Sequence, residues 1–205
     1  MQIHLVGGFL GSGKTTAIVG AARLLAARGM VVGVVTNHQG KHLVDTAFVQ
    51  AGGFPAVEVT GGCFCCHYDD LVARLEQLQQ VARPDVIFAE SVGSCADLVA
   101  TVVKPLLAFD AAFTPASFSV FADCRLLRRR LLGEELPFSD EVSYIFDQQI
   151  EEAGLLVVNK VDLLPKAALA ELRGLASRRW PGKALIFHSA VPQPEAEPRG
   201  AANIE

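Results

Sequence analysis

The sequence lacks any segment that is long and apolar enough to cross a membrane. No stretch of ~18 residues, the length that a span requires, is free of both charged residues and proline. Residues 1–13 are uncharged, yet no basic segment precedes them and no small-residue cleavage site follows, so a signal peptide is not predicted. We therefore expect a cytoplasmic protein with no membrane partner.

A basic surface of the kind that binds nucleic acid is also missing. Eighteen Lys and Arg residues stand against 22 Asp and Glu residues, which gives a net charge of −4 at pH 7. The basic run at residues 128–130 is interpreted as a solvated helix face. Nucleic acid is therefore not an expected partner.

The cysteines do not follow a disulfide pattern. There are five, an odd number, and three of them, Cys63, Cys65 and Cys66, fall within four residues. Cysteines this close together rarely pair with one another, whereas secreted disulfide scaffolds carry an even set at wider spacings. This pattern indicates a reducing compartment, in agreement with the expected cytoplasmic location.

What the chain does contain is enough apolar material for a large core. Hydrophobic residues make up 51% and charged residues 20%, with a mean hydropathy of +0.33. The length of 205 residues suits one domain, at a prior of ~150 residues per domain. We expect that domain to span residues 1–191, and residues 192–205, with three prolines, to form a disordered tail.

Short β-branched runs alternate with helix-like segments along this domain. A helix is predicted over residues 14–27, and another carries Leu71, Leu75 and Leu78 on one apolar stripe. The alternation predicts an α/β fold with a mostly parallel, doubly wound sheet, whose ligands bind where the strands end. Strands are predicted at residues 3–6, 31–35, 57–59, 86–89, 118–121, 155–158 and 184–187.

The loop after the first predicted strand has the pattern G-x-x-x-x-G-K-[ST]. Its glycines allow successive N–H groups to point at an anion beside a helix N-terminus. Lys14 would reach the β- and γ-phosphates of a nucleotide, and the Thr15 hydroxyl would ligate Mg²⁺. The residues predicted to bind the phosphates are Gly8, Gly11, Ser12, Gly13, Lys14, Thr15 and Thr16.

The predicted strand at 155–158 runs into an N-K-x-D pattern at 159–162. The carboxylate of Asp162 can accept from both N1–H and the 2-amino group of guanine, a pair that adenine lacks. Asn159 is expected either to contact the base or to brace the phosphate loop. These features predict GTP as the nucleotide and a G domain of P-loop NTPase type. The predicted base-binding residues are Asn159, Lys160 and Asp162, with Ser189 and Ala190 offering a backbone N–H to guanine O6.

A carboxylate for Mg²⁺ follows another predicted strand. Residues 86–89 lead directly into Glu90, and Gly93 comes three residues later. Glu90 is predicted to hold Mg²⁺ through water, and Gly93 to let the chain move with the γ-phosphate, as switch segments do.

The three clustered cysteines lie behind a Gly-Gly pair. We expect Cys63 and Cys65 to face the same way along an extended segment, with Cys66 or His67 completing a set of metal ligands. Thiolate and imidazole ligands favour Zn²⁺ or Cu(I), and Co²⁺ or Ni²⁺ stays open. Core packing and a redox thiol pair are the alternatives. His38 and His42 are further candidate ligands, and Cys95 and Cys124 are interpreted as small buried hydrophobes.

Together these motifs resemble the CobW-type GTPases, which are relatives of the UreG and HypB metal-insertion GTPases. The resemblance spans about residues 2–190. It rests on the phosphate loop at 8–16, the G-C-x-C-C metal motif at 62–66, the E-x-x-G motif at 90–93 and the N-K-x-D motif at 159–162. Asn37, Gly40 and Asp45 match the first switch segment of that family.

The resemblance implies GTP hydrolysis coupled to delivery of a metal, zinc or cobalt, to a client metalloprotein. Asp45 and Glu90 are then expected to close toward the γ-phosphate, and a homodimer is expected across the nucleotide face. Because the thiols lie between two switch segments, metal affinity should differ between the GTP and GDP forms.

This sequence also departs from the family pattern. Family members usually carry acidic residues where Thr36, His38 and Lys41 stand, and they continue into a second domain. Hydrolysis is therefore expected to be slow or partner-stimulated, and no residue is assigned as the catalytic base. Two alternatives remain: a GTP-responsive zinc sensor or buffer with little turnover, and an ordinary P-loop NTPase or kinase with structural cysteines.

Overall fold

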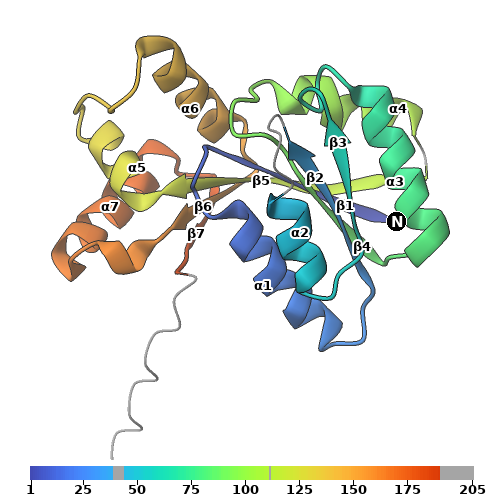
Figure 1. The fold of residues 1–205 in the computed structure, drawn as a ribbon. Coiled ribbons are helices and arrows are strands. Elements are labelled where there is room, and N and C mark those ends of the chain that lie inside the picture. Colours follow the sequence, from blue (N-terminus) through green and yellow to red (C-terminus); the bar gives the residue numbers. More distant parts are fainter. Residues whose placement is uncertain (39–43, 111, 190–205) are drawn as a thin grey trace, which may run out of the picture.

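The computed structural model of this chain describes residues 1–38, 44–110 and 112–189. Its centre is a seven-stranded sheet with strands β1 (Gln2–Gly8), β2 (Val32–His38), β3 (Ala56–Thr60), β4 (Val86–Glu90), β5 (Thr114–Asp123), β6 (Leu155–Asn159) and β7 (Ala184–Phe187). Their order across the sheet is β3-β2-β4-β1-β5-β6-β7, and every neighbouring pair is parallel (Figure 1). The predicted α/β fold with a parallel sheet is confirmed.

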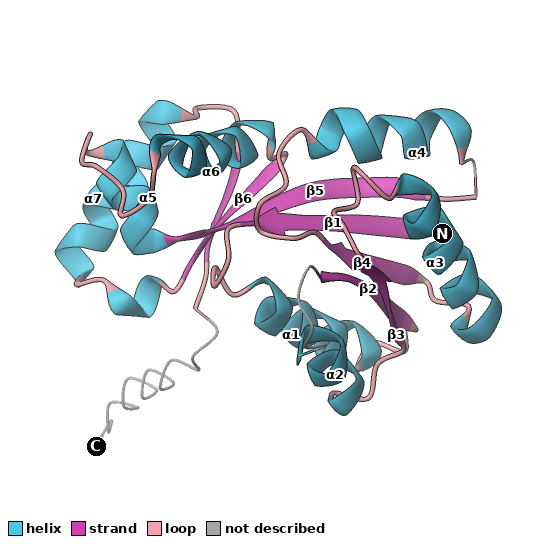
Figure 2. Ribbon diagram, turned by 45° about the horizontal axis from the view of Figure 1, so that its top comes forward, coloured by secondary structure: helices cyan, strands magenta, loops and turns pink. Residues whose placement is uncertain are grey.

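Helices cover both faces of this sheet, as Figure 2 shows. Helices α1 (Lys14–Ala26) and α2 (Val44–Ala51) lie on one face. The other face is covered by α3 (Tyr68–Ala82), α4 (Lys104–Phe109), α5 (Cys124–Leu131), α6 (Asp140–Glu152) and α7 (Lys166–Arg179). A π-helical turn (Val99–Val103) precedes α4, and a 3-10 turn (Val161–Leu163) follows β6.

Alternate side chains of the central strands build two separate cores. Leu5 and Val35 belong to the larger core under α3, whereas their neighbours Val6 and Val34 belong to the smaller core under α1. This follows from the two-residue period of a strand, because both faces of a doubly wound sheet are covered. The strands therefore read as continuous apolar runs, which is why the sequence located all seven.

Strand β2 extends further than the sequence predicts. The prediction ends at residue 35, but Thr36 and Asn37 continue the ladder, with Asn37 opposite Val59 and His38 opposite Thr60 of β3. Thr36 is paired with both β3 and β4, whereas Asn37 and His38 are paired with β3 alone. Asn37 is thereby placed at the same edge of the sheet as the ends of β3 and β4.

Within the described ranges, each helix is too short or too polar to traverse a bilayer. Several sequence predictions fall outside those ranges: Gly40, Lys41 and His42 of the first switch segment, Ala190, and the tail at 192–205.

Candidate functional site

The phosphate loop joins β1 to α1, at the carboxyl edge of the sheet. Gly13 caps α1 with φ of 93°, a left-handed conformation that disfavours a side chain. A Cβ at Gly13 would also lie 2.4 Å from the side-chain nitrogen of Asn159, so the glycine is required by space as well. The Ser12 hydroxyl is buried and has no hydrogen-bond partner among the described residues. A buried, unsatisfied polar group in such a loop is what an anion site requires.

Lys14 lies inside this loop and is only 7% exposed. Its Nζ donates a 3.0 Å hydrogen bond to the carbonyl of Gly8 and lies 3.8 Å from Oε1 of Glu90. Burial lowers the pKa of Lys14, while the nearby carboxylates of Glu90 and Asp45 counteract that effect. The ammonium group of Lys14 thus lies near the N-terminus of α1, close to the carboxylates of Glu90 and Asp45. In that position it can bind a more highly charged anion such as a nucleotide phosphate.

The Thr15 hydroxyl lies between two carboxylates that come from distant parts of the chain. It donates to Oε1 of Glu90 at 2.9 Å and to Oδ1 of Asp45 at 3.2 Å. Glu90 is 5% exposed, and its other oxygen, Oε2, is buried without a hydrogen-bond partner in the described part of the chain. Burial raises the pKa of Glu90 to about 7, although Lys14 and Thr15 oppose the rise.

One hydroxyl and two carboxylates form a set of hard oxygen donors. Such sets suit Mg²⁺, which binds one or two carboxylates together with substrate phosphates. The Oε2 of Glu90 has no hydrogen-bond partner among the described residues, and the pKa of Glu90 stays raised although Lys14 is near its Oε1. A further cation at Oε2 would compensate this burial, so the residues present fit Mg²⁺. The structure thus brings together all three predicted Mg²⁺ residues, including Asp45, which only the family resemblance had suggested.

The loop that follows Glu90, residues 91–98, touches the phosphate loop directly. A Cβ at Gly93 would lie 2.6 Å from the backbone nitrogen of Leu10, so only glycine allows this approach. Gln149 of α6, which is fully buried, donates to the carbonyls of Gly93 at 2.9 Å and Cys95 at 2.6 Å. We call residues 91–98 the β4 loop. Its position is fixed by the phosphate loop on one side and by Gln149 on the other.

At the other end of the site, Asn159 braces the phosphate loop. Its amide donates to the carbonyl of Ser12 at 2.8 Å, and its Oδ1 pairs with Nδ1 of His188 at 2.9 Å. Of the two roles that the sequence left open for Asn159, bracing the loop is the one that its contacts support. The N-K-x-D motif therefore links the base end of the site to the phosphate end.

Lys160 lies beside an acidic residue that sequence reasoning missed, and Asp162 lies beside Ser189, which was predicted. The Lys160 ammonium is 3.1 Å from Oδ2 of Asp123, which ends β5. Burial opposes ionisation of Asp123, but hydrogen bonds from Arg125 and Lys160 lower its pKa to about 2. Ser189 donates from its hydroxyl to Asp162. Asp123 follows a predicted strand end, and that position was the only sequence signal for it.

Two adjoining cavities extend along these residues. One, of about 520 Å³, is lined by phosphate-loop residues together with Asp45, Phe48, Glu90 and Lys160. The second, of about 450 Å³, is lined by α1 residues, His188 and Ser189, and it shares Thr16 with the first. Volumes of this order are typical of small-molecule sites.

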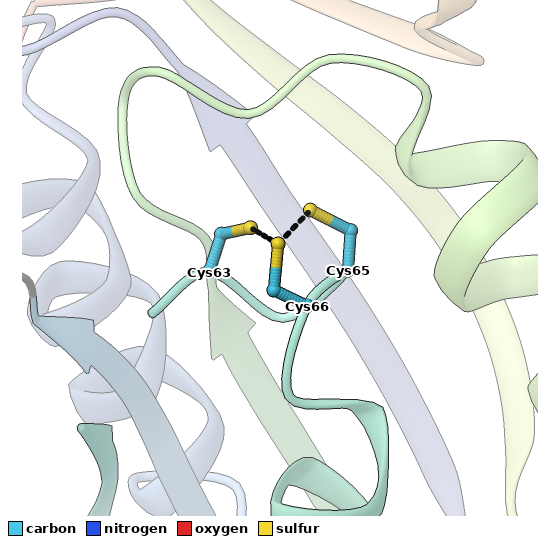
Figure 3. A group of neighbouring side chains, drawn as sticks. All are labelled: Cys63, Cys65 and Cys66. Atoms are coloured by element: carbon cyan, nitrogen blue, oxygen red, sulfur yellow. Dashed lines mark hydrogen bonds between the residues drawn. The ribbon is translucent and has the colours of Figure 1, made fainter. Parts of the chain in front are cut away.

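The three clustered cysteines form a turn, which we call the thiol turn (residues 63–66; Figure 3). The backbone nitrogens of Cys66 and His67 both donate to the carbonyl of Cys63 at 3.0 Å. The thiols of Cys63 and Cys66 are 3.1 Å apart, those of Cys65 and Cys66 are 4.0 Å apart, and all three lie within 4.8 Å of one another. The predicted convergence is confirmed, but its predicted cause, alternation along an extended strand, is wrong.

The proximity of the thiols shifts their proton affinities in opposite directions. Burial opposes ionisation of Cys63, yet hydrogen bonds from Cys65 and Cys66 lower its pKa to about 7. Burial and the neighbouring Cys63 raise the pKa of Cys65 to about 12. One thiolate can therefore form near neutral pH while a second is disfavoured by the first. A soft cation would relieve that conflict, so the donor set fits zinc or a similar metal.

The structure does not place a predicted histidine ligand with the three thiols among the described residues. His67 immediately precedes α3, and its ring packs against Gly62: a Cβ there would lie 2.2 Å from Cε1 of His67. The converging group consists of the three cysteines and does not include His67. The side chain of His38, at the end of β2, lies outside what the structure describes. Cys95 and Cys124 are buried, as predicted.

The thiol turn is also tied to the first switch segment. Asn37, at the end of β2, donates from Nδ2 to the carbonyl of Gly62 at 2.6 Å and to that of Val59 at 3.1 Å. Both carbonyls belong to the chain that leads from β3 into the turn. The sequence singled out Asn37 only through the family resemblance, and nothing in it indicated this contact.

Comparison with known proteins places this site in a family context. The sequence model of the family described as CobW/HypB/UreG, nucleotide-binding domain, matches residues 2–187. The chain is 28% identical over 206 residues to the zinc chaperone CobW of Sinorhizobium sp, covering 90% of this chain and 58% of that protein. It is 31% identical over 168 residues to the zinc chaperone YeiR of Escherichia coli (strain K12), covering 78% of this chain and 47% of that protein.

The chain spans about half the length of these two curated relatives. Among solved structures, it is similar to HypB from Helicobacter pylori in complex with nickel, with a TM-score of 0.61 and 14% identity. That similarity covers 92% of this chain and 78% of the HypB chain. At this identity the likeness shows the fold alone.

Proposed function

The chain belongs to the CobW/HypB/UreG family of nucleotide-binding domains, and from this premise we propose that it is a GTPase that handles a transition metal. It binds GTP with Mg²⁺, hydrolyses the nucleotide, and couples the nucleotide state to binding zinc and delivering it to a client metalloprotein. The observation that carries the proposal is the thiol turn, in which three thiols converge and which Asn37 of the first switch segment contacts through the carbonyl of Gly62.

The nucleotide half of the proposal rests on the two adjoining cavities. Lys14 and the backbone of the phosphate loop would bind the phosphates, and the unsatisfied Ser12 hydroxyl offers one more hydrogen bond. Asp162 would accept from both donors on the guanine edge, with Lys160 along the ring. Asn159 would hold the phosphate-binding and base-binding ends at a fixed distance, because its amide donates to the carbonyl of Ser12 and does not contact the base.

Thr15, Glu90 and Asp45 would hold Mg²⁺, which neutralises developing charge on the phosphate oxygens when it is bound. Thr15 already hydrogen-bonds both carboxylates, so the three oxygen donors are gathered before the nucleotide arrives. Because Glu90 is the last residue of β4 and Asp45 lies in α2, each carboxylate connects the γ-phosphate region to one switch segment.

The metal half rests on the three thiols and their flanking contacts. Thiolates select soft or borderline cations, and the names of the two curated relatives favour zinc over cobalt or nickel as cargo. The turn is exposed at Cys66, which leaves the metal accessible to a client protein. A client protein, a homodimer across the nucleotide face and a reducing cytoplasmic location all belong to this proposal.

The test compares zinc affinity in two nucleotide states, by competition with a chelating dye. We expect at least a tenfold difference between the forms bound to a Mg²⁺–GTP analogue and to GDP, ~1.4 kcal/mol of coupling. Cys63→Ser should lose tight zinc binding in both states. Equal affinities in the wild-type protein would leave a GTP-binding protein with a passive metal site. If the protein binds no zinc at all, the cysteines serve core packing or redox chemistry instead.

A second candidate is a zinc sensor that uses GTP as a conformational ligand with little turnover. It is favoured by Thr36, whose buried hydroxyl is bonded to Thr46 at 2.6 Å, while Thr46 donates to Glu58 at 2.9 Å. That network is internally satisfied, so Thr36 does not replace the acidic switch residue of related proteins in positioning water. Multiple-turnover phosphate release distinguishes the two: release beyond one equivalent supports the GTPase. A preference for ATP over GTP would instead indicate an ordinary P-loop kinase or NTPase.

A further inference from the structure

Lys160, the second residue of the N-K-x-D motif, has an unusual backbone conformation. Its φ of 61° and ψ of 36° lie in the left-handed region, which a side chain disfavours. In the described ranges, Arg83 and Asp97 are the other non-glycine residues with positive φ. Arg83 ends α3, where a left-handed residue is common, whereas Lys160 precedes the 3-10 turn after β6. Strained residues of this kind persist where surrounding contacts hold them, and they cluster at functional sites.

Two consecutive residues at the end of β5 hold Lys160. The thiol of Cys124 donates to the backbone carbonyl of Lys160 at 3.0 Å. The carboxylate of Asp123 accepts a 3.1 Å hydrogen bond from the Lys160 ammonium through Oδ2. These contacts follow from the strand pairing, because Asp123 lies opposite Asn159 at the ends of β5 and β6. One neighbour therefore fixes the backbone of Lys160, and the other fixes the tip of its side chain.

Asp123 is itself held in one orientation. It is 5% exposed and is the N-cap of α5, where its Oδ1 accepts from the backbone nitrogen of Arg125 at 2.9 Å. The guanidinium of Arg125 donates to both carboxylate oxygens, at 3.1 and 2.8 Å. Burial opposes ionisation of Asp123, but these bonds and the one from Lys160 outweigh it, so its pKa of about 2 keeps it charged at neutral pH. The Lys160 ammonium thus meets a fixed anion.

Lys160 also forms part of the wall of the cavity of about 520 Å³ at the phosphate loop, together with Lys14 and Thr15. A lysine side chain has a long flexible stem and loses rotamer entropy when a ligand orders it. In this protein the backbone and the ammonium of Lys160 are both held before any ligand arrives. The stem between them is thus ordered in advance, and ligand binding at this wall costs less side-chain entropy.

We propose that Asp123 is a positioning residue for nucleotide binding, which orders Lys160 as a platform for the face of the base. This inference rests on the proposed GTP-binding function and deepens it, because it divides base recognition into two tasks. Asp162 would read the edge of the base, where guanine differs from other purines. The stem of Lys160 would contact the ring face, which all purines share. Asp123 therefore contributes affinity for the nucleotide and not selectivity among purines.

The test measures the affinities of the full chain for GTP and for inosine triphosphate, which lacks the 2-amino group, by competition with a fluorescent GTP analogue. Asp123→Asn keeps an N-cap oxygen for α5 but removes the charge that holds Lys160. We expect both affinities to fall about tenfold while their ratio changes less than about twofold. Asp147→Asn is the control, because it takes a carboxylate from a pair with Arg130 on α5 and should leave both affinities unchanged.

A double-mutant cycle separates positioning from a merely structural role. Lys160→Met keeps an apolar stem and removes the ammonium, and it should weaken binding of both nucleotides about tenfold. In that background Asp123→Asn should add less than about twofold, because the contact through which it acts is already gone. A further loss near tenfold in the double variant, or a changed ratio of the two affinities in Asp123→Asn, would overturn the assignment. Asp123 would then act through α5 or through the placement of Asp162.

Other outcomes separate this inference from the proposed function. Wild-type binding of GTP with unchanged affinity in Asp123→Asn would overturn the role of Asp123 and leave the proposed function intact. Failure of the wild-type protein to bind GTP would overturn both. Asp123→Ser, which also keeps an N-cap oxygen, serves if Asp123→Asn does not fold. Unchanged affinities in Lys160→Met would overturn the assignment whatever the Asp123 variants do.

Discussion

The side-chain amide of Asn37 donates a 2.6 Å hydrogen bond to the carbonyl of Gly62, the residue before the first cysteine of the thiol turn. The same amide donates to the carbonyl of Val59 at 3.1 Å. Asn37 lies near the end of β2, in the first switch segment, so a displacement of β2 would shift the residues that lead into the thiol turn. This bond joins the first switch segment to the residues that lead into the thiol turn.

Replacing Asn37 with alanine should therefore weaken zinc binding about tenfold and lower stability. Two backbone carbonyls would lose their donor, and an unsatisfied buried acceptor costs about 1–3 kcal/mol. Dye competition measures the first effect and urea unfolding the second. Gln50→Ala is the control, because it removes a comparable amide bond to Ala56, on the exposed surface near β3. Equal effects of the two variants on zinc would contradict a special role for Asn37.

Replacing Lys14 with alanine should reduce GTP affinity about 100-fold or more, because a buried ammonium at the phosphate loop makes strong charge-assisted bonds to phosphate. Binding of a fluorescent GTP analogue measures the loss. Lys166→Ala removes an exposed lysine at the start of α7 and should leave affinity unchanged. Near-wild-type affinity in Lys14→Ala would show that the phosphates bind elsewhere.

Asp162→Asn should change the base preference of the protein from guanine to xanthine. An amide oxygen can accept from one guanine donor but its NH₂ opposes the other, whereas xanthine offers a matching carbonyl. We expect the ratio of GTP to xanthosine triphosphate affinity to fall about 100-fold. Asp140→Asn, at the exposed start of α6, is the control. A ratio that does not move in Asp162→Asn would mean that another group reads the base.

The stability of the nucleotide-free protein should depend on pH through Glu90. Burial raises the pKa of Glu90 to about 7 in the folded state, above its ordinary value of 4.5. The folded state then holds a proton that the unfolded state has lost, so stability falls as pH rises from about 4.5 to about 7 and levels off above that. The loss is on the order of 3 kcal/mol.

Urea unfolding of the nucleotide-free protein at pH 5 and pH 8 measures this effect. Glu90→Gln cannot ionise, so its stability should fall less between the two pH values than that of the wild-type protein. Glu76→Gln, which alters an exposed carboxyl of α3, should match the wild-type protein. Parallel pH profiles for wild-type and Glu90→Gln would show that Glu90 is ionised throughout, and that its burial is already compensated.

Much of the fold was predictable because its signals are local. Strands buried on both faces are continuous apolar runs, and the phosphate loop, the N-K-x-D motif and the three clustered cysteines are each contained in a few neighbouring residues. The boundary of β2 was missed because Thr36 and Asn37 are polar. Thr36 is kept in the sheet by pairing with β3 and β4, and Asn37 by pairing with β3. The thiols converge through the backbone bonds of a turn, which the spacing of Cys63 and Cys65 did not distinguish from an extended segment.

The sequence by itself determined the class of fold, the phosphate loop, the base-reading motif and the presence of a thiol cluster. Only the tertiary structure decided that Asn37 donates to the carbonyl of Gly62 and that Asn159 braces the phosphate loop. The physical reason is the strand order: β2 and β4 are adjacent, so loops that are distant in the chain end at one edge of the sheet. Contacts of that kind depend on which strands are neighbours, and no local pattern encodes them.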